Sequence, residues 1–201
     1  MTNKSIKIYR IKITLKNIRP PIWRRILVPE TYLFQELHTA IQDAMGWDDY
    51  HLHEFQVGDV CIEGKGNGFC VDAMWGSHFS QETRVSAIST KLNELITKEK
   101  QKFNYIYDFG DQWKHALVLE KILPAEDGVV YPVCLDGKRA CPPEDCGGPW
   151  GYEDFLCTMG DPDDPEYEER LEWAGGKFDP EHFDAKEILF RNPVKINNKN
   201  K

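Results

Sequence analysis

The feature that most constrains the fold is a pair of apolar segments joined by a short polar turn. Residues 103–107 and 113–123 alternate between apolar and polar side chains, a pattern typical of strands that bury one face. The intervening residues 108–111 include Gly110, which can adopt a positive φ. Two such segments around so short a connection predict an antiparallel hairpin.

Further strands are expected before this hairpin. Residues 6–15 alternate in the same way, but the phase slips between Ile8 and Ile11, which predicts a bulge or a change of face. Residues 22–28 follow after a short break and predict the antiparallel neighbour. Residues 51–57 also have strand character.

One helix is predicted between these strands. Thr31 can cap its start, and Gly46 supplies a left-handed stop. A single apolar stripe connects the two ends: Leu33, Leu37, Ile41, Ala44 and Met45. Residues 58–80 are rich in glycine and predict a mobile hairpin or loop, and residues 86–95 predict a short segment that contributes to the core.

The last third of the chain changes in character. Residues 132–149 are dense in Pro, Gly and Cys and predict a loop. Short helices are expected at 151–159, between Asp164 and Gly176, and from Asp184 to Phe190. Residues 193–201 are expected to be a disordered tail. Strands at the front and helices at the back favour one α+β domain with an antiparallel sheet.

Composition and charge limit the function classes. The 201 residues are 41% hydrophobic, and none of the apolar runs approaches the roughly 20 residues that cross a bilayer. The N-terminus lacks the apolar core of a secretion signal, so we expect a cytoplasmic protein with reduced cysteines.

The net charge of −8 makes nucleic acid an unlikely partner. The charge is nevertheless uneven: all eight charged side chains before Glu30 are basic, and residues 144–187 are strongly acidic. We expect these two segments to face each other or to be solvated, rather than to form a nucleic-acid strip.

A histidine pair is the clearest candidate for metal binding. On a strand, His51 and His53 would project to the same face, and His115 could join them. Further oxygen donors would be Asp108, Asp111 or Glu54. However, Phe55 and Val57 share the parity of the two histidines, which favours a buried and hydrogen-bonded pair. No cofactor is predicted, and a divalent metal is the alternative.

The loop at 140–152 offers two other kinds of chemistry. Cys141 and Cys146 have a spacing at the outer limit of structural zinc sites, but the stiff prolines between them favour a rigid loop with half-buried thiols. Glu144 and Asp145 could bind a divalent metal or act in acid–base catalysis.

Structural roles for these two carboxylates are the simpler interpretation. They could cap the helix that begins near Gly151, or pair with Arg24 and Arg25. Trp150, in the same loop, could line a pocket.

Six segments together resemble a known family. They are PPIWRR (20–25), ELHTAIQDAMGW (36–47), HLHEF (51–55), YDFGDQWKH (107–115), YPVCLDG (131–137) and ACPPEDCGGPWGY (140–152). The chain is similar to the plasmid Ri ORF-3-like family, whose members are also labelled insertion-element passenger TnpR proteins. The resemblance implies one α+β domain of roll-like topology over residues 1–192, inside the cell and associated with mobile elements. It implies no established activity.

The leading hypothesis is a non-catalytic module that binds a protein or small ligand, with no catalytic residue assigned. The site would combine the 108–115 hairpin with the 140–152 loop, through Asp108, Asp111, Trp113, His115, Glu144, Asp145 and Trp150. One alternative is a metal-dependent hydrolase or nuclease that uses His51, His53 and His115 with Asp108 or Asp111. The other is DNA association through the basic N-terminal strands, although the motifs do not support the resolvase label.

Overall fold

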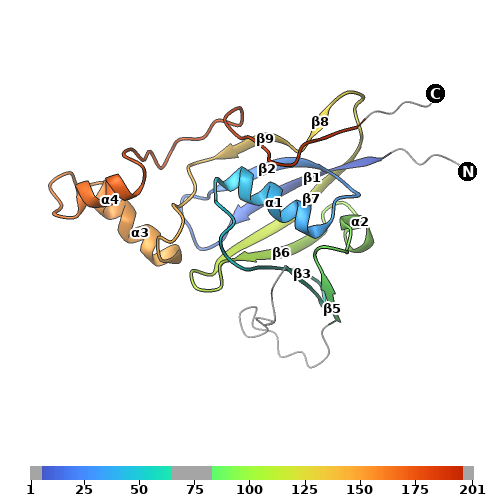
Figure 1. Cartoon of the computed structure of the whole chain (residues 1–201), viewed down its shortest axis with the longest axis horizontal. Coiled ribbons are helices and arrows are strands. Elements are labelled where there is room, and N and C mark those ends of the chain that lie inside the picture. The colour runs from blue at the N-terminus through green and yellow to red at the C-terminus, as the bar shows by residue number, and fades with distance from the viewer. Residues whose placement is uncertain (1–5, 65–82, 197–201) are drawn as a thin grey trace, which may run out of the picture.

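A computed structural model describes residues 6–64 and 83–196, and its centre is one large sheet (Figure 1). The sheet has eight strands in the order β5-β4-β3-β6-β7-β1-β2-β9. They are β1 (Lys7–Leu15), β2 (Trp23–Pro29), β3 (His53–Val57), β4 (Val60–Glu63), β5 (Thr83–Ser86), β6 (Lys102–Tyr107), β7 (Trp113–Pro124) and β9 (Val133–Lys138). All neighbours are antiparallel except β4 and β5. The predicted α+β class is confirmed.

The predicted hairpin is formed by β6 and β7, with Tyr107 opposite Trp113. On its other side, β7 pairs with β1, and the register of that pair shifts between Arg10 and Ile11. The extra residue is Glu120 of β7, so the bulge predicted within residues 6–15 is not in β1. Tyr9, Ile11 and Ile13 keep an unbroken alternation and pack in the main core, whereas Ile8 is buried on the opposite face of the sheet.

Helix α1 (Phe34–Met45) packs on the sheet and contributes Leu37 and Ile41 to the core, as its apolar stripe predicted (Figure 1). Gly46 ends the helix with a φ of 84°. The predicted cap is wrong, because the helix starts after Leu33 rather than after Thr31. The Leu33 amide donates to the Glu36 carboxylate over 2.7 Å, and this bond replaces a side-chain cap.

Two segments near the β5 edge of the sheet were expected to have little regular structure beyond a loop or a short core segment. Residues 60–63 belong to the segment expected to be a mobile hairpin or loop, and they form β4, which pairs antiparallel with β3. The remainder of that prediction falls on residues 65–82, outside the described residues. After β5, helix α2 (Leu92–Leu95) buries Leu92, and Ile96 follows it into the core as expected.

The prediction of one continuous loop over 132–149 is wrong. Residues 133–138 form β9, which pairs with β2 at the edge of the sheet. This strand is half-exposed and contains Asp136 and Gly137, both poor strand formers, so its sequence lacks the usual alternation.

Helices α3 (Gly148–Met159) and α4 (Tyr167–Trp173) match two of the predicted C-terminal helices. Figure 1 shows them to one side of the sheet. The third helix, predicted from Asp184 to Phe190, is absent from the described chain. Asp184 instead accepts a hydrogen bond from the Lys186 amide in a local turn, and Glu187 pairs with His182.

The expected tail does not begin at residue 193. Strand β10 (Val194–Lys195) pairs with β8 (Val130–Tyr131), and Ile196 is only 5% exposed. Ile196 packs with Ile8 and Tyr131 in a second, smaller core. Burial of the Ile196 side chain stabilises the packing of the last described residues against the sheet. Within the described ranges, no helix is long and apolar enough to cross a membrane.

Candidate functional site

The turn of the β6–β7 hairpin and the loop before α3 lie against each other. The Asp111 carboxylate accepts a hydrogen bond from the Gly147 amide over 3.0 Å. Gly148 has a φ of 70°, and a Cβ placed on it would lie 2.5 Å from the carbonyl oxygen of Asp111. Only glycine fits so close to the other backbone. We refer to the surface formed by residues 108–112 and 144–152 as the hairpin–loop face.

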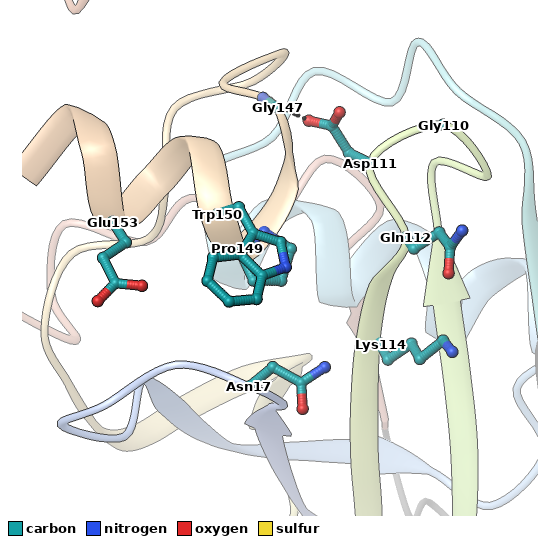
Figure 2. Close-up of a pocket in the computed structure, with 9 residues that line it drawn as sticks. All are labelled: Asn17, Gly110, Asp111, Gln112, Lys114, Gly147, Pro149, Trp150 and Glu153. Carbon is teal, nitrogen blue, oxygen red and sulfur yellow. Dashed lines mark hydrogen bonds between the residues drawn. The ribbon is translucent and has the colours of Figure 1, made fainter.

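A cleft of about 660 Å³ opens beside this face (Figure 2). Trp150, at the start of α3, is 82% exposed and faces the hairpin residues Gln112 and Lys114 across the cleft. The lining residues come from three parts of the chain: Asn17, Gly110, Asp111, Gln112, Lys114, Gly147, Pro149, Trp150 and Glu153.

Next to the cleft, the same two segments surround the imidazole of His51 with carboxylates. Its Nε2 lies 2.9 Å from Oδ1 of Asp145, 3.7 Å from Oδ2 of Asp108 and 3.9 Å from Oε1 of Glu144. Asp108 and Asp145 both have positive φ, which Asp adopts more readily than most residues. Sequence reasoning had named all four of these residues, but not as one group.

Tyr107 holds Glu144 in this group. The Tyr107 hydroxyl donates to Oε1 of Glu144, and the Asp48 amide donates to Oε2 over 3.1 Å. Burial and the Glu144 carboxylate raise the pKa of Tyr107, so its hydroxyl keeps its proton and acts as a donor. Neither Tyr107 nor Asp48 was predicted from the sequence.

Two predicted binding residues lie elsewhere. Trp113 is 1% exposed and His115 is fully buried, so neither can contact a ligand at the surface. The His115 ring packs edge-on against Trp47 and beside Tyr105. Trp113 and His115 are buried because alternate residues of β7 face the core, and these two residues are both on that face.

The expected pairing of His51 with His53 on one face of a strand is wrong. Strand β3 begins at His53, so His51 lies before the strand and does not follow its alternation. His53 is buried and stacks on His38, with ring centroids 3.4 Å apart. His38, which lies on the buried side of α1, could not be recognised from the sequence as a partner of His53.

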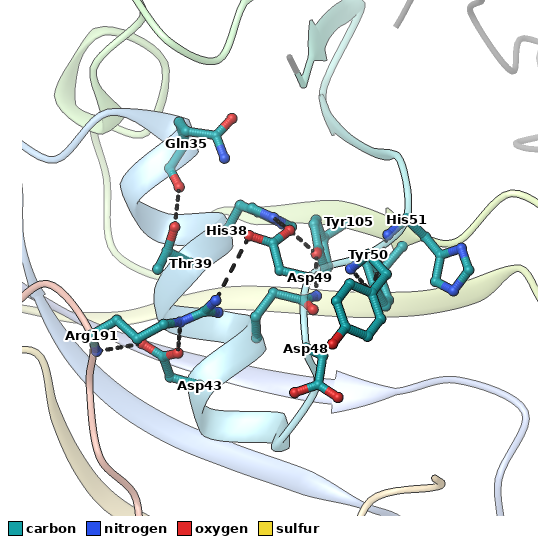
Figure 3. A network of polar contacts seen from close by, with 12 residues as sticks. Gln35, His38, Thr39, Asp43, Asp48, Asp49, Tyr50, His51, Tyr105 and Arg191 are labelled. Atoms are coloured by element: carbon teal, nitrogen blue, oxygen red, sulfur yellow. Dashed lines mark hydrogen bonds and ion pairs between the residues drawn. The ribbon is translucent and has the colours of Figure 1, made fainter. Parts of the chain in front are cut away.

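His38 is the centre of a closed polar network (Figure 3). Its Nε2 lies 2.5 Å from Oδ1 of Asp49, and its Nδ1 lies 2.7 Å from the Tyr105 hydroxyl. Gln42 donates to that hydroxyl, so the tyrosine proton is directed to Nδ1 and Nε2 carries the ring proton. Arg191 lies 4.0 Å from the other oxygen of Asp49. Both nitrogens of His38, the Tyr105 hydroxyl and the Asp49 carboxylate have partners, whereas Oε1 of Gln42 forms no hydrogen bond to the described residues. The histidine is thus held on both sides, which suits a structural role.

The buried histidines predict a loss of stability in mild acid. Burial and, to a lesser extent, His38 lower the pKa of His53 to about 2. Burial lowers the pKa of His115 to about 3, and nearby backbone groups offset this only in part. Below about pH 6.5 these histidines are protonated in the unfolded chain but stay neutral in the folded chain. The free energy of unfolding therefore decreases as the pH is lowered, by about 1.4 kcal/mol per pH unit for each histidine.

Urea unfolding between pH 7.5 and pH 5 measures this slope. The variant His115→Phe removes one of the two groups and is expected to show a shallower slope than the wild type. Equal slopes in the two proteins would show that His115 does not contribute.

Cys141 and Cys146 of the loop are half-buried, as the sequence predicted. Sγ of Cys141 accepts a hydrogen bond from the Arg24 guanidinium over 3.1 Å and lies 3.2 Å from Sδ of Met45. Burial raises the pKa of the Cys141 thiol, and it raises that of Cys146 to about 12. Both groups are thiols at neutral pH, a state that disfavours nucleophilic chemistry.

The expected partners of Glu144 and Asp145 are also different. Arg24 is buried and bonds to backbone carbonyls, and Arg25 pairs with Glu120. Helix α3 begins at Gly148 without a side-chain cap. Glu144 and Asp145 therefore contact Tyr107 and His51, and not Arg24, Arg25 or the start of α3.

Known proteins resemble this chain over most of its length. It is 39% identical over 169 residues to the uncharacterized protein y4hQ of Sinorhizobium fredii, a match that covers 84% of this chain and 81% of the relative. A crystal structure of a protein of unknown function from Methanosarcina mazei, MM3350, matches with a TM-score of 0.78 and 42% identity, over 93% of this chain and 100% of the other. The model of the plasmid pRiA4b ORF-3-like proteins matches residues 7–187, and the chain belongs to this family.

Proposed function

We propose that this protein is a non-catalytic binding module that acts in the cytoplasm, where its hairpin–loop face binds a short segment of a partner protein. The observation that carries the proposal is the position of Trp150. Its indole is 82% exposed at the edge of the cleft, in the first turn of α3, directly after the Gly147 amide that Asp111 holds in place. An indole costs free energy when exposed, and a rigid exposed tryptophan is a frequent centre of binding energy in protein interfaces.

The cleft suits a polar peptide segment. Lys114 and Gln112 supply donors, and the Glu153 carboxylate supplies an acceptor, at a site where Trp150 and Pro149 offer apolar surface. This mixture of one aromatic anchor and several polar groups is typical of a transient protein interface.

DNA association has weaker support. The basic N-terminal strands are partly neutralised within the sheet, because Arg10 and Arg25 both form ion pairs with Glu120. Arg24 is buried, so it offers no charge to a phosphate.

The proposal predicts that Trp150→Ala abolishes partner binding. Tagged wild-type protein is incubated with an extract of its own host, and the retained proteins are quantified by mass spectrometry. A partner is expected to be retained by the wild type and reduced at least about tenfold by Trp150→Ala, the loss expected at an interface hot spot.

The matched control is Trp173→Ala. Trp173 is 50% exposed on α4 and packs edge-on against Phe155, away from the residues that line the cleft. This variant is expected to retain the partner as the wild type does. The proposal fails if Trp150→Ala retains the same proteins, or if both variants lose them equally.

The approach of His51 to Asp108 favours a second candidate, a metal-dependent hydrolase. Of the residues expected for that activity, His53 and His115 are buried in other surroundings, and Asp111 holds Gly147. This candidate therefore needs a metal on a different set of ligands. Titration of the full chain with a divalent metal tests that requirement first.

A further inference from the structure

We propose that His51, Asp108 and Asp145 form a binding site for one divalent transition-metal ion. The site is separate from the peptide cleft and does not depend on it. One imidazole nitrogen and one oxygen of each carboxylate lie within 4.8 Å of one another. Ligand atoms around one ion with bonds of about 2.0–2.2 Å lie within a similar span of one another, so the three side chains need to move little.

Asp108 is a largely buried residue with one carboxylate oxygen directed to His51. The residue is 8% exposed. Its Oδ1 accepts a hydrogen bond from the Gly110 amide over 2.8 Å, and its Oδ2 faces His51 at 3.7 Å, too far for a hydrogen bond. Oδ2 accepts no hydrogen bond from the described residues, so its lone pairs are available to a cation between it and the imidazole.

The imidazole of His51 also has an atom without a hydrogen bond. Its Nε2 is enclosed and forms no hydrogen bond to the described residues, although Asp145 lies only 2.9 Å away. The Asp145 oxygen is thus close to the nitrogen without the alignment of a hydrogen bond. An ion between the two would use the nitrogen lone pair and the carboxylate oxygen together.

The local charge also favours a cation. Three carboxylates, those of Asp108, Glu144 and Asp145, lie within 3.9 Å of one imidazole nitrogen. In the described part of the chain, the only cationic side chain that forms an ion pair with any of the three is His51 itself. One imidazolium would leave most of this negative charge uncompensated, whereas a dication would neutralise it.

The ligand types indicate the metal. One imidazole with two carboxylates suits Mn²⁺, Fe²⁺ or Zn²⁺, whereas Mg²⁺ and Ca²⁺ prefer oxygen ligands alone. Three protein ligands leave coordination positions for water. Glu144, which Tyr107 and the Asp48 amide hold in place, lies where its carboxylate could accept a hydrogen bond from such a water.

Titration of the full chain with Zn²⁺ and Mn²⁺ tests the site. After treatment with a chelator, Zn²⁺ binding is measured by isothermal titration calorimetry and Mn²⁺ binding by electron paramagnetic resonance. The wild type is expected to bind one ion per chain. Asp108→Asn and Asp145→Asn are each expected to weaken binding at least about tenfold. Asn tolerates the positive φ at both positions, so both variants are expected to fold.

Two further variants make the assignment specific. Asp163→Asn removes one acidic group from an exposed stretch and is expected to bind like the wild type. Asp49→Asn changes the other group that could hold an ion, formed by His38, Asp49 and His53, and is also expected to bind like the wild type. The proposal is overturned if the wild type binds no ion at millimolar concentration, if the Asp108 and Asp145 variants bind as tightly as the wild type, or if Asp49→Asn alone loses the ion.

Discussion

Replacing Arg24 by alanine is expected to lower the free energy of unfolding by about 3 kcal/mol or more. The guanidinium is 3% exposed, and its Nε donates to the Ala44 carbonyl over 2.9 Å. Its other nitrogens donate to the carbonyls of Trp23 and Lys138 and to Sγ of Cys141. One side chain thus joins β2, the end of α1, β9 and the start of the cysteine loop, and its removal takes the donor from one buried and three partly buried hydrogen bonds.

Urea unfolding followed by tryptophan fluorescence measures this loss, and Arg25→Ala is the matched control. Arg25 is the neighbouring residue, but it is partly exposed and its main partner is Glu120 at the surface of the sheet. Surface ion pairs contribute about 1 kcal/mol or less. Equal losses in the two variants would contradict the role of the buried guanidinium.

Replacing Gly148 by alanine is expected to cost about 3 kcal/mol and to separate the hairpin from the loop. The left-handed backbone accounts for roughly 1–2 kcal/mol of this. The remainder comes from the contact of the new Cβ with the Asp111 carbonyl oxygen, which would lie 2.5 Å away, and overpacking of this kind costs about 1–3 kcal/mol. Since neither backbone can yield without moving a strand end or α3, the hydrogen bond from Gly147 to Asp111 is expected to break.

Gly128→Ala isolates the effect of the contact. Gly128 also has a positive φ, of 79°, but a Cβ there would meet no atom within 4 Å. Unfolding experiments are expected to show a loss of only about 1–2 kcal/mol for Gly128→Ala. If the two glycine variants lose the same stability, the close approach of hairpin and loop is not a tight contact.

The strands and helices that bury a regular apolar pattern could be predicted from the sequence. The β6–β7 hairpin and the stripe of α1 both follow from periods of 2 or 3.6 residues, because one face of each element packs into the core. The predictions for residues 133–138, which form β9, and for residues 184–190 were wrong because these segments lack a regular apolar pattern. Where little apolar surface is buried, pairing with β2 or a local turn at Asp184 decides the structure, and neither is visible in the sequence.

The site was predictable only in its parts. Turn glycines, carboxylates and an exposed aromatic pointed to the hairpin and the 140–152 loop, and the structure brings these two segments together. The start of β3 could not be located to the residue, so His51 and His53 were assigned to one face although they lie in different surroundings. The roles of Tyr107 and Asp49 depend on tertiary contacts that join distant parts of the chain, and local patterns carry no sign of them.

The most direct test of the proposed function is hydrogen–deuterium exchange on the complex with the captured partner. The segments to compare are 108–112 and 144–152, which form the hairpin–loop face, and 167–173, which forms α4. Binding at the cleft predicts that amide exchange slows in the first two segments and is unchanged in α4. Unchanged exchange across the hairpin–loop face, with protection confined to other parts of the chain, would contradict the proposed function.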